Sequence, residues 1–293
     1  MERLGLAMKG WKISGSYSSK EELVAMEDKK IGLALGGGAA RGLAHIGVLR
    51  ALEASNIKVD YIAGTSAGAV AGAAYARGTS PDALKEMALS MGVRDWASLA
   101  DVGIPHGGFI SGNRIKSLLK VIIGDVDFKD LAIPFACVAC DLYTGEEVVI
   151  NKGSVLEAVR ASISIPIVFS VVERDGRFLV DGGLINQVPV NVVREMGADI
   201  VIGVNVIPTL KSRKKKAAAK KVKQPGIFDV MTHVIDITNA KTVIKSLKGA
   251  NVVINPDTRD YTSADFHQAK DLILQGELAG ELSIPEIELA LKQ

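Results

Sequence analysis

Two short apolar segments near the start of the sequence each run into a glycine-rich turn and then into a helical pattern. Residues 31–35 (IGLAL) precede the glycine-rich segment 36–42, and residues 59–63 (VDYIA) precede GTSAG at 64–68. The helical patterns that follow these turns cover residues 43–54 and 67–77. A strand that turns directly into a helix, twice in succession, is typical of a parallel sheet whose faces are covered by helices.

The rest of the chain continues this alternation. An Asp175-Gly176 pair between two apolar-alternating runs favours a hairpin over residues 168–180. Further strands are expected at 135–140, 147–150, 200–206 and 251–255, and further helices at 81–91, 113–121, 155–162, 190–196, 227–247 and 264–274. We therefore expect an α/β fold, a single three-layer domain with a mostly parallel sheet and helices on both faces. The domain is expected over 31–280, after a loosely ordered leader (1–30) and before a C-terminal tail (281–293).

The composition agrees with a soluble globular protein and removes several other classes. Of the 293 residues, 48% are hydrophobic and 23% are charged, which excludes collagen-like, coiled-coil and disordered chains. No apolar run approaches the roughly 18 residues of a membrane span. Residues 1–30 carry charges throughout and lack the apolar core of a secretory signal. A cytoplasmic protein is therefore expected, with a membrane-peripheral location as the alternative.

One segment departs from this average composition. Residues 211–223 (KSRKKKAAAKKVK, Lys211 to Lys223) carry eight positive charges and no acid, whereas the whole chain has a net charge of only +2. Such a segment repels itself and is typical of a solvated loop. Attraction to an anionic membrane is the main functional alternative, because each Lys or Arg near such a surface contributes about 1 kcal/mol. Nucleic acid is not expected as a partner, since no nucleic-acid-binding motif accompanies the charge.

The segment GTSAG has the G-x-S-x-G pattern and lies between an expected strand and an expected helix. Gly64 and Gly68 allow a sharp turn without side-chain clashes, and this turn would present the Ser66 hydroxyl at the carboxyl end of the sheet. The amide end of the following helix would then favour negative charge at the site. The pattern also fits a glycine-rich turn with Ser66 as an ordinary helix cap. Its context favours a nucleophile elbow.

The glycine-rich segment 36–42 (GGGAARG) permits three interpretations. A dinucleotide-binding G-x-G-x-x-G fails by one residue in either register, and a phosphate-binding P-loop fails because no Gly-Lys-Ser/Thr follows. The remaining interpretation is an oxyanion hole, which needs only main-chain amides that face a reacting carbonyl. The candidates for these amides are Gly37, Gly38 and Ala39.

A third motif, Asp181-Gly182-Gly183, follows an expected strand. A carboxylate there could accept the Ser66 proton or orient a histidine, although a turn aspartate that caps the next segment has the same pattern. A Ser-Asp-His order requires a histidine after Asp181, and only His233 and His267 qualify. Both lie in expected helices rather than in a loop at a strand end. A catalytic dyad of one Ser and one Asp is therefore the simpler interpretation.

Three stretches, LALGGGAARGLAHIGVL, GTSAG and LVDGGLINQVPV, occur in that order and resemble the patatin-like phospholipase family, specifically its small bacterial members. The similarity covers roughly residues 31–275. It implies a serine acyl hydrolase with Ser66 as the nucleophile, Asp181 as the general base and the amides of Gly37 to Ala39 as the oxyanion hole. Arg41 matches the basic residue that follows the glycine triplet in this family and would help to hold a lipid phosphate. The resemblance implies a lipid or acyl-ester substrate.

Ala39 departs from the family pattern, because this place is usually held by Gly. An oxyanion donor needs only its N–H, but alanine tolerates positive φ poorly. No metal is expected, since no acidic loop with calcium-binding spacing is present, and no cofactor is expected either.

The sequence thus favours a serine acyl-ester hydrolase of lipids, of the phospholipase A, lysophospholipase or esterase kind. Three alternatives stay open: an α/β-hydrolase with a histidine triad, a nucleotide-binding protein that uses the glycine loop, and a non-catalytic membrane-associated regulatory adaptor with the same fold. An aspartate is a weak base in water, so the first interpretation predicts that Asp181 is partly buried and within hydrogen-bond reach of Ser66.

Overall fold

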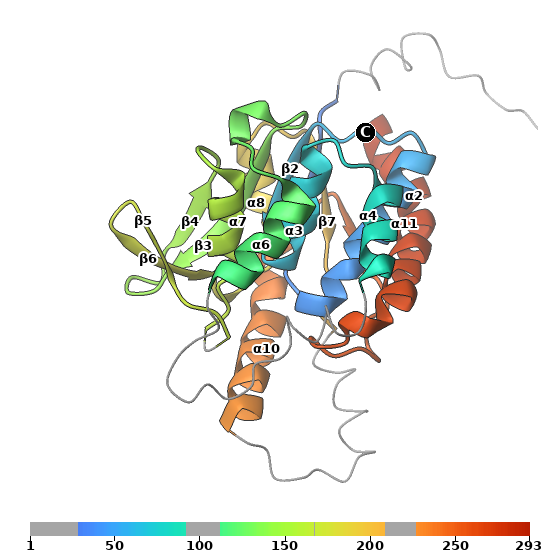
Figure 1. The fold of residues 1–293 in the computed structure, drawn as a ribbon. Helices are drawn as coiled ribbons and strands as arrows, with labels where there is room; N and C mark the ends of the chain where they lie inside the picture. Colours follow the sequence, from blue (N-terminus) through green and yellow to red (C-terminus); the bar gives the residue numbers. More distant parts are fainter. Residues whose placement is uncertain (1–28, 92–111, 167, 209–226) are drawn as a thin grey trace, which may run out of the picture.

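A computed structural model describes residues 29–91, 112–166, 168–208 and 227–293. Nearly all of the expected leader (1–30) and the whole basic loop (211–223) lie outside the described residues. The described chain forms an α/β fold around one sheet (Figure 1).

The sheet of the described residues has eight strands. They are β1 (Ile31–Leu35), β2 (Tyr61–Thr65), β3 (Phe135–Asp141), β4 (Glu147–Ile150), β5 (Val172–Arg174), β6 (Arg177–Asp181), β7 (Ile200–Val204) and β8 (Val252–Ile254). The order is β5-β6-β3-β2-β1-β7-β8, with β4 paired to β3. The central run from β3 to β8 is parallel, while β4, β5 and β6 pair in antiparallel fashion. The expected mostly parallel sheet is confirmed.

Helices cover both faces of this sheet. They are α2 (Ala44–Ala54), α3 (Ala67–Ala76), α4 (Pro81–Ser90), α6 (Gly112–Ile123), α7 (Val155–Ser162), α8 (Val190–Glu195), α10 (Ile227–Ser246) and α11 (Ala269–Lys292). Alternation along β1 sends Leu33 and Leu35 into a core shared with α2, α3, α7 and α11, and sends Ala34 into a second core shared with α8. The expected three-layer arrangement is therefore present. None of the described helices combines the length and apolar character that a membrane span needs.

The C-terminal segment differs from the expectation of a tail at 281–293. Helix α11 continues to Lys292 and contains Pro285. A proline inside a helix removes one hydrogen bond and costs about 3 kcal/mol. Burial of Ile287 and Leu291, at 0% and 8% exposure, offsets this cost by packing the last turns onto the main core.

The register of β3 determines which residues meet at the edge of the sheet. Strand β2 pairs with β3 as far as Thr65 and Val138, while β4 takes the opposite edge of β3. Strand β6 therefore takes the β2 side just beyond the end of β2, and Asp181 pairs with Ala139 there. The first residue after β2 is Ser66, so two residues far apart in sequence are brought to one point. The hairpin that delivers Asp181 turns at Asp175-Gly176 as expected, with φ of 50° and 74°.

Candidate active site

Ser66 lies at a sharp turn between β2 and α3. Its φ of 53° and ψ of −119° are a strained conformation for a residue with a side chain. The turn is possible because the helix approaches the sheet closely at two glycines. A Cβ on Gly64 would lie 2.5 Å from Gly68 O, and a Cβ on Gly68 would lie 2.1 Å from Leu35 O. Both glycines of the motif are therefore required by close contact.

Asp181 faces Ser66 directly. The Ser66 hydroxyl donates a hydrogen bond of 2.6 Å to Asp181 Oδ2, and the Gly183 N–H donates one of 2.8 Å to Oδ1. Ser66 and Asp181 are 5% and 6% exposed. The carboxylate thus caps the short 3-10 turn at Gly182–Leu184 and also contacts the serine. Asp181 is therefore both a capping aspartate and a partner of Ser66.

The two glycines after Asp181 leave room for this arrangement. A Cβ on Gly182 would lie 2.2 Å from Val138 O, and a Cβ on Gly183 would lie 2.6 Å from Gln187 Oε1 and 3.0 Å from Asp181 Oδ1. Any side chain at these positions would push the carboxylate or its strand away from Ser66.

Burial raises the pKa of Asp181 to about 6, and the hydrogen bonds from Ser66 and Gly183 oppose the rise only in part. A carboxylate with this pKa is a stronger base than an ordinary aspartate and is still ionised at neutral pH. The pair can therefore take a proton from a hydroxyl that attacks a bound carbonyl.

The glycine loop differs from the expectation in one donor. The Gly37 N–H donates a hydrogen bond of 3.0 Å to Gln187 O, so this amide is already occupied and is not an oxyanion donor. The Gly36 N–H continues the pairing with β7 by donating to Val204 O, whereas the next amide, that of Gly37, meets Gln187 O of the segment before α8. Gly37 still needs to lack a side chain, since a Cβ there would lie 3.2 Å from Ser66 Cβ.

The next two amides remain available. Within the described residues, the N–H groups of Gly38 and Ala39 donate to no protein acceptor, and both residues line the same cavity as Ser66. Ala39 has a φ of 49°, the left-handed conformation that glycine adopts more readily. The departure from the family pattern at residue 39 is thus an alanine in a strained conformation in the wall of the cavity that contains Ser66.

Three further residues support Ser66 or the glycine loop, and the sequence analysis did not identify them as site residues. The Ser66 N–H donates to Ser162 Oγ (2.9 Å), whose hydroxyl donates to Val138 O (2.6 Å) and so ties the strained turn to β3. Gln187 Nε2 donates to Gly37 O (2.6 Å) and fixes the glycine loop. Ala67 is the first residue of α3 and follows Ser66 directly. In a G-x-S-x-G turn, the position after the serine is where a main-chain N–H can face the reacting group, so the motif could have identified Ala67.

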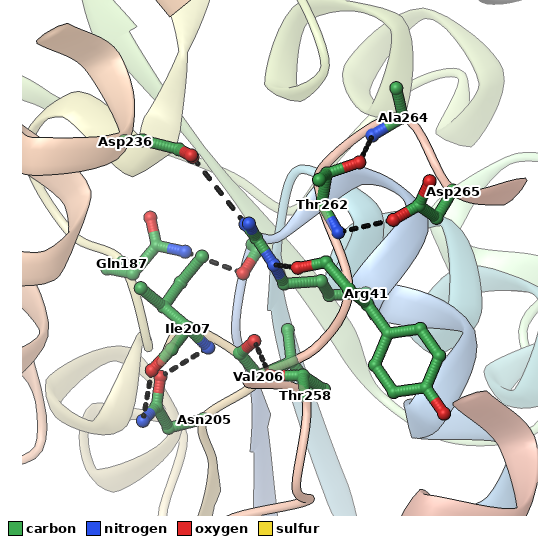
Figure 2. A network of polar contacts seen from close by, with 12 residues as sticks. Arg41, Gln187, Asn205, Val206, Ile207, Asp236, Thr258, Thr262, Ala264 and Asp265 are labelled. Carbon is green, nitrogen blue, oxygen red and sulfur yellow. Dashed lines mark hydrogen bonds and ion pairs between the residues drawn. The ribbon is translucent and has the colours of Figure 1, made fainter. Parts of the chain in front are cut away.

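Arg41 occupies a different place from the one expected. It is 5% exposed and is not among the described residues that line the cavity. Its Nε donates to Tyr261 O (3.0 Å), and its Nη1 lies 3.6 Å from Asp236 Oδ1 on α10 (Figure 2). Arg41 therefore joins the glycine loop to α10 and to the chain before α11.

In the described part of the chain, no histidine is a hydrogen-bond partner of Ser66 or Asp181. His45 Nε2 instead donates to Gly36 O (2.7 Å), and burial lowers the pKa of His45 to about 4. His45 is therefore neutral at pH 7 and supports the start of the glycine loop. His233 lies on α10, His267 lies in the short 3-10 turn Phe266–Gln268, and His106 lies outside the described residues.

A cavity of about 320 Å³ opens at Ser66. Gly38, Ala39 and Asp181 line it together with Ser66. Most of its remaining described wall is apolar and comes from α3, α4, α6 and the side chains Ile163, Ile165, Pro166, Val168 and Phe169. No group of three or more His, Cys, Asp or Glu that could hold a metal gathers within the described ranges. The arrangement is a buried hydroxyl–carboxylate pair with free amides beside an apolar cavity.

An α/β sheet with a polar site where parallel strands end defines a broad class of proteins whose ligands bind at that edge. The family model for patatin-like phospholipases matches residues 33–194, which is more than half of the chain. The chain belongs to the patatin-like phospholipase family, as the sequence motifs predicted.

The similarity to individual relatives covers only part of each relative's length. An uncharacterized NTE family protein of Mycobacterium tuberculosis is 38% identical over 177 residues, 60% of this chain and 49% of the relative. Patatin-like phospholipase domain-containing protein 6 of Mus musculus is 35% identical over 186 residues, 60% of this chain and 13% of that protein. The chain spans about half the length of the mycobacterial relatives that it matches.

Among solved structures, VipD from Legionella pneumophila is similar with a TM-score of 0.39 and 13% identity, over 84% of this chain and 66% of that one. The type III effector protein ExoU has a TM-score of 0.40 and 13% identity, over 90% of this chain and 53% of that one.

Proposed function

We propose that the protein is a serine acyl-ester hydrolase of lipid substrates, with Ser66 as nucleophile and Asp181 as general base. The observation that carries this proposal is the buried hydrogen bond of 2.6 Å between Ser66 Oγ and Asp181 Oδ2 in the wall of a largely apolar cavity. Membership in the patatin-like phospholipase family supports the same activity.

The reaction begins with Ser66 Oγ attacking the ester carbonyl while its proton moves to Asp181 Oδ2. The carbonyl oxygen becomes an oxyanion that accepts hydrogen bonds from the amides of Gly38 and Ala39. When this tetrahedral intermediate collapses, the ester C–O bond breaks and the alcohol leaves with the proton from Asp181. An acyl-enzyme remains. A water molecule then loses a proton to Asp181 and attacks the carbonyl of the acyl-enzyme. The bond between Ser66 Oγ and the acyl carbon breaks, the fatty acid leaves, and the proton returns from Asp181 to Ser66 Oγ.

Electrostatics around the pair favour the transition state. The developing negative charge lies beside the first amides of α3, where the helix dipole is positive. Each correctly placed amide donor contributes about 3 kcal/mol of transition-state stabilisation in comparable sites. Burial removes water that would otherwise solvate Asp181 and weaken it as a base.

The experiment that tests the proposal is turnover of p-nitrophenyl acyl esters by the wild-type protein, together with labelling by a fluorophosphonate. The proposal expects both. If the folded protein neither turns over any ester nor reacts with the probe, the regulatory adaptor with the same fold replaces the hydrolase.

The pH dependence of turnover should follow Asp181. Because the base must be ionised and its pKa is about 6, kcat/KM should rise with pH and reach half of its plateau near pH 6. An ordinary aspartate would give a midpoint near 4. The measurement is kcat/KM of a short p-nitrophenyl ester between pH 4.5 and 8, roughly the range over which such a midpoint is resolved. A flat profile above pH 5 would contradict a catalytic base with a pKa near 6.

We also propose peripheral contact with anionic membrane through Lys211 to Lys223. The segment directly precedes α10, whose exposed residues include the apolar side chains Val230, Val234, Ile237 and Ile244 and the basic side chain Lys241. These positions recur every three or four residues and so share one helix face. Exposed apolar side chains that gather on one face are typical of an interaction site for a membrane or a protein, and the basic segment beside them favours an anionic membrane.

Neutralising Lys214–Lys216 to glutamine should weaken binding to vesicles that contain phosphatidylserine by roughly 100-fold, because each lysine contributes about 1 kcal/mol there. Cosedimentation with phosphatidylserine and phosphatidylcholine vesicles measures this. The matched control replaces three exposed lysines elsewhere, Lys58, Lys129 and Lys152, with glutamine. Equal binding by both triple variants would show that this segment does not contact the membrane.

A further inference from the structure

We infer that the segment at the end of α7, residues 160–164 (RASIS), fixes the separation of Ser66 and Asp181, with Ser162 as the main positioning residue. This inference rests on the proposed function, because it assigns a role in the same reaction. Ser162 is not among the described residues that line the cavity. It acts through the main chain of the reacting pair and not by contact with the substrate.

Ser66 and Asp181 both lie where strand pairing ends. Strand β2 pairs with β3 as far as Thr65, and β6 pairs with β3 as far as Asp181. In the described sheet, β2 and β6 each pair with β3 and not with one another. A main-chain N–H that is buried at the end of a strand needs an acceptor from outside the sheet. The contact between the two side chains therefore depends on the groups that hold these two N–H groups.

The end of α7 provides an acceptor for each of them. The Ser66 N–H donates to Ser162 Oγ (2.9 Å), and the Asp181 N–H donates to Ser164 O (3.0 Å). Ser162 and Ser164 are 0% and 1% exposed, so both bonds are shielded from competing water. Two residues of one short segment thus hold the main chain on both sides of the reacting pair.

The Ser162 hydroxyl is fixed in the direction that Ser66 needs. It donates its hydrogen to Val138 O of β3 (2.6 Å), which leaves its lone pairs for the Ser66 N–H. An alanine at this position could make neither bond. The φ of Ser66 is 53°, a strained value for a residue with a side chain. Loss of the bond to Ser162 therefore lets the main chain relax and moves Ser66 Oγ away from Asp181.

Arg160 braces the other half of the segment. Its Nη1 donates to Ser164 Oγ (2.7 Å), and its Nη2 donates to Ser170 O (3.0 Å) and Ser170 Oγ (3.1 Å). The guanidinium also lies 5.5 Å from the centre of the Phe169 ring, a favourable cation–π distance. Buried in this way, Arg160 keeps the chain folded back after α7, with Ser164 O directed at the Asp181 N–H.

The variant that tests this inference is Ser162→Ala, which removes one hydroxyl and adds no volume. The kcat for p-nitrophenyl butyrate should fall about 100-fold, because a misplacement of about 1 Å between reacting groups has an effect of this size. The KM should stay at the wild-type value, since Ser162 does not line the cavity. Steady-state kinetics give both constants, and thermal unfolding shows that the variant is folded.

The matched control is Ser154→Ala, the same change at the other end of α7. Ser154 caps this helix by accepting a hydrogen bond from the Glu157 N–H (3.4 Å), so its loss weakens α7 without a contact to the reacting pair. Ser154→Ala should lower the unfolding temperature and keep the wild-type kcat. If Ser162 were important for stability alone, Ser162→Ala would behave in the same way, and the inference would be wrong.

The outcomes separate the inference from the proposed function. If the wild type is active and Ser162→Ala keeps its kcat, or changes KM alone, the positioning role is wrong and the hydrolase stands. If the folded wild type turns over no ester, the proposed function fails, and this inference with it. Should Ser162→Ala not fold, Ser162→Cys decides, because a thiol has a similar shape but is only a weak acceptor. Loss of its kcat at an unchanged KM supports the inference, and a wild-type kcat contradicts it.

Discussion

Replacing Ser66 with alanine should lower kcat for every ester by at least about 10⁴-fold, because the nucleophile that forms the acyl-enzyme is removed. What remains is the activity of water in a site that still has its amide donors. The substitution should leave folding intact, since the hydroxyl's contact is with Asp181 and the amide of residue 66 still donates to Ser162. Turnover of p-nitrophenyl butyrate under single-turnover and steady-state conditions measures the loss.

The matched control for this variant is Ser283→Ala. Ser283 is a partly buried serine of α11 whose hydroxyl bonds only to Ala279 O of its own helix. It should retain wild-type turnover. Retention of more than about a hundredth of the wild-type kcat by Ser66→Ala would mean that another residue is the nucleophile.

Replacing Asp181 with asparagine should lower kcat about 10³- to 10⁴-fold, because an amide fills the same space but cannot accept the serine proton. The rise of activity with pH near 6 should disappear with the carboxylate. The matched control is Asp125→Asn, an exposed carboxylate whose contact is an ion pair with Lys120, and it should leave both kcat and the pH profile unchanged.

Stability provides an independent readout for Asp181→Asn. Burial raises the pKa of Asp181 from 3.8 to about 6, so the folded state prefers the neutral carboxyl. The stability from this preference is fully present below pH 4 and is lost as the pH rises through 6, by about 2 to 3 kcal/mol in total. The asparagine variant avoids this loss. Its thermal stability relative to wild type should therefore improve between pH 4 and pH 8, while its activity is lost.

Much of the fold was predictable because local patterns and sheet topology agree. The apolar strands, the glycine-rich turns between strand and helix and the Asp175-Gly176 hairpin are each indicated by a short local pattern, and the structure confirms them. The end of the chain was not predictable in this way. Pro285 argues locally for the end of a helix, and only burial of Ile287 and Leu291 against the core keeps α11 helical.

In the candidate site, too, local motifs predicted some features, while others depend on tertiary contacts. The motifs identified Ser66 and Asp181, whose contact depends on the register of β3 and so on pairings that no local pattern reveals. The occupied amide of Gly37 could not be predicted, because its acceptor, Gln187 O, is far away in sequence. Likewise, Arg41 has a basic side chain suited to phosphate, yet tertiary contacts with Asp236 and Tyr261 decide where it lies.

The most direct test of the central claim is to find which residue a fluorophosphonate modifies in the wild-type protein. After brief labelling, proteolysis and peptide mass spectrometry would locate the adduct. The account predicts a single adduct on Ser66, formed more slowly below pH 6 and slowed strongly by Asp181→Asn. An adduct on a different residue, or ester turnover that continues after Ser66 is fully modified, would contradict it.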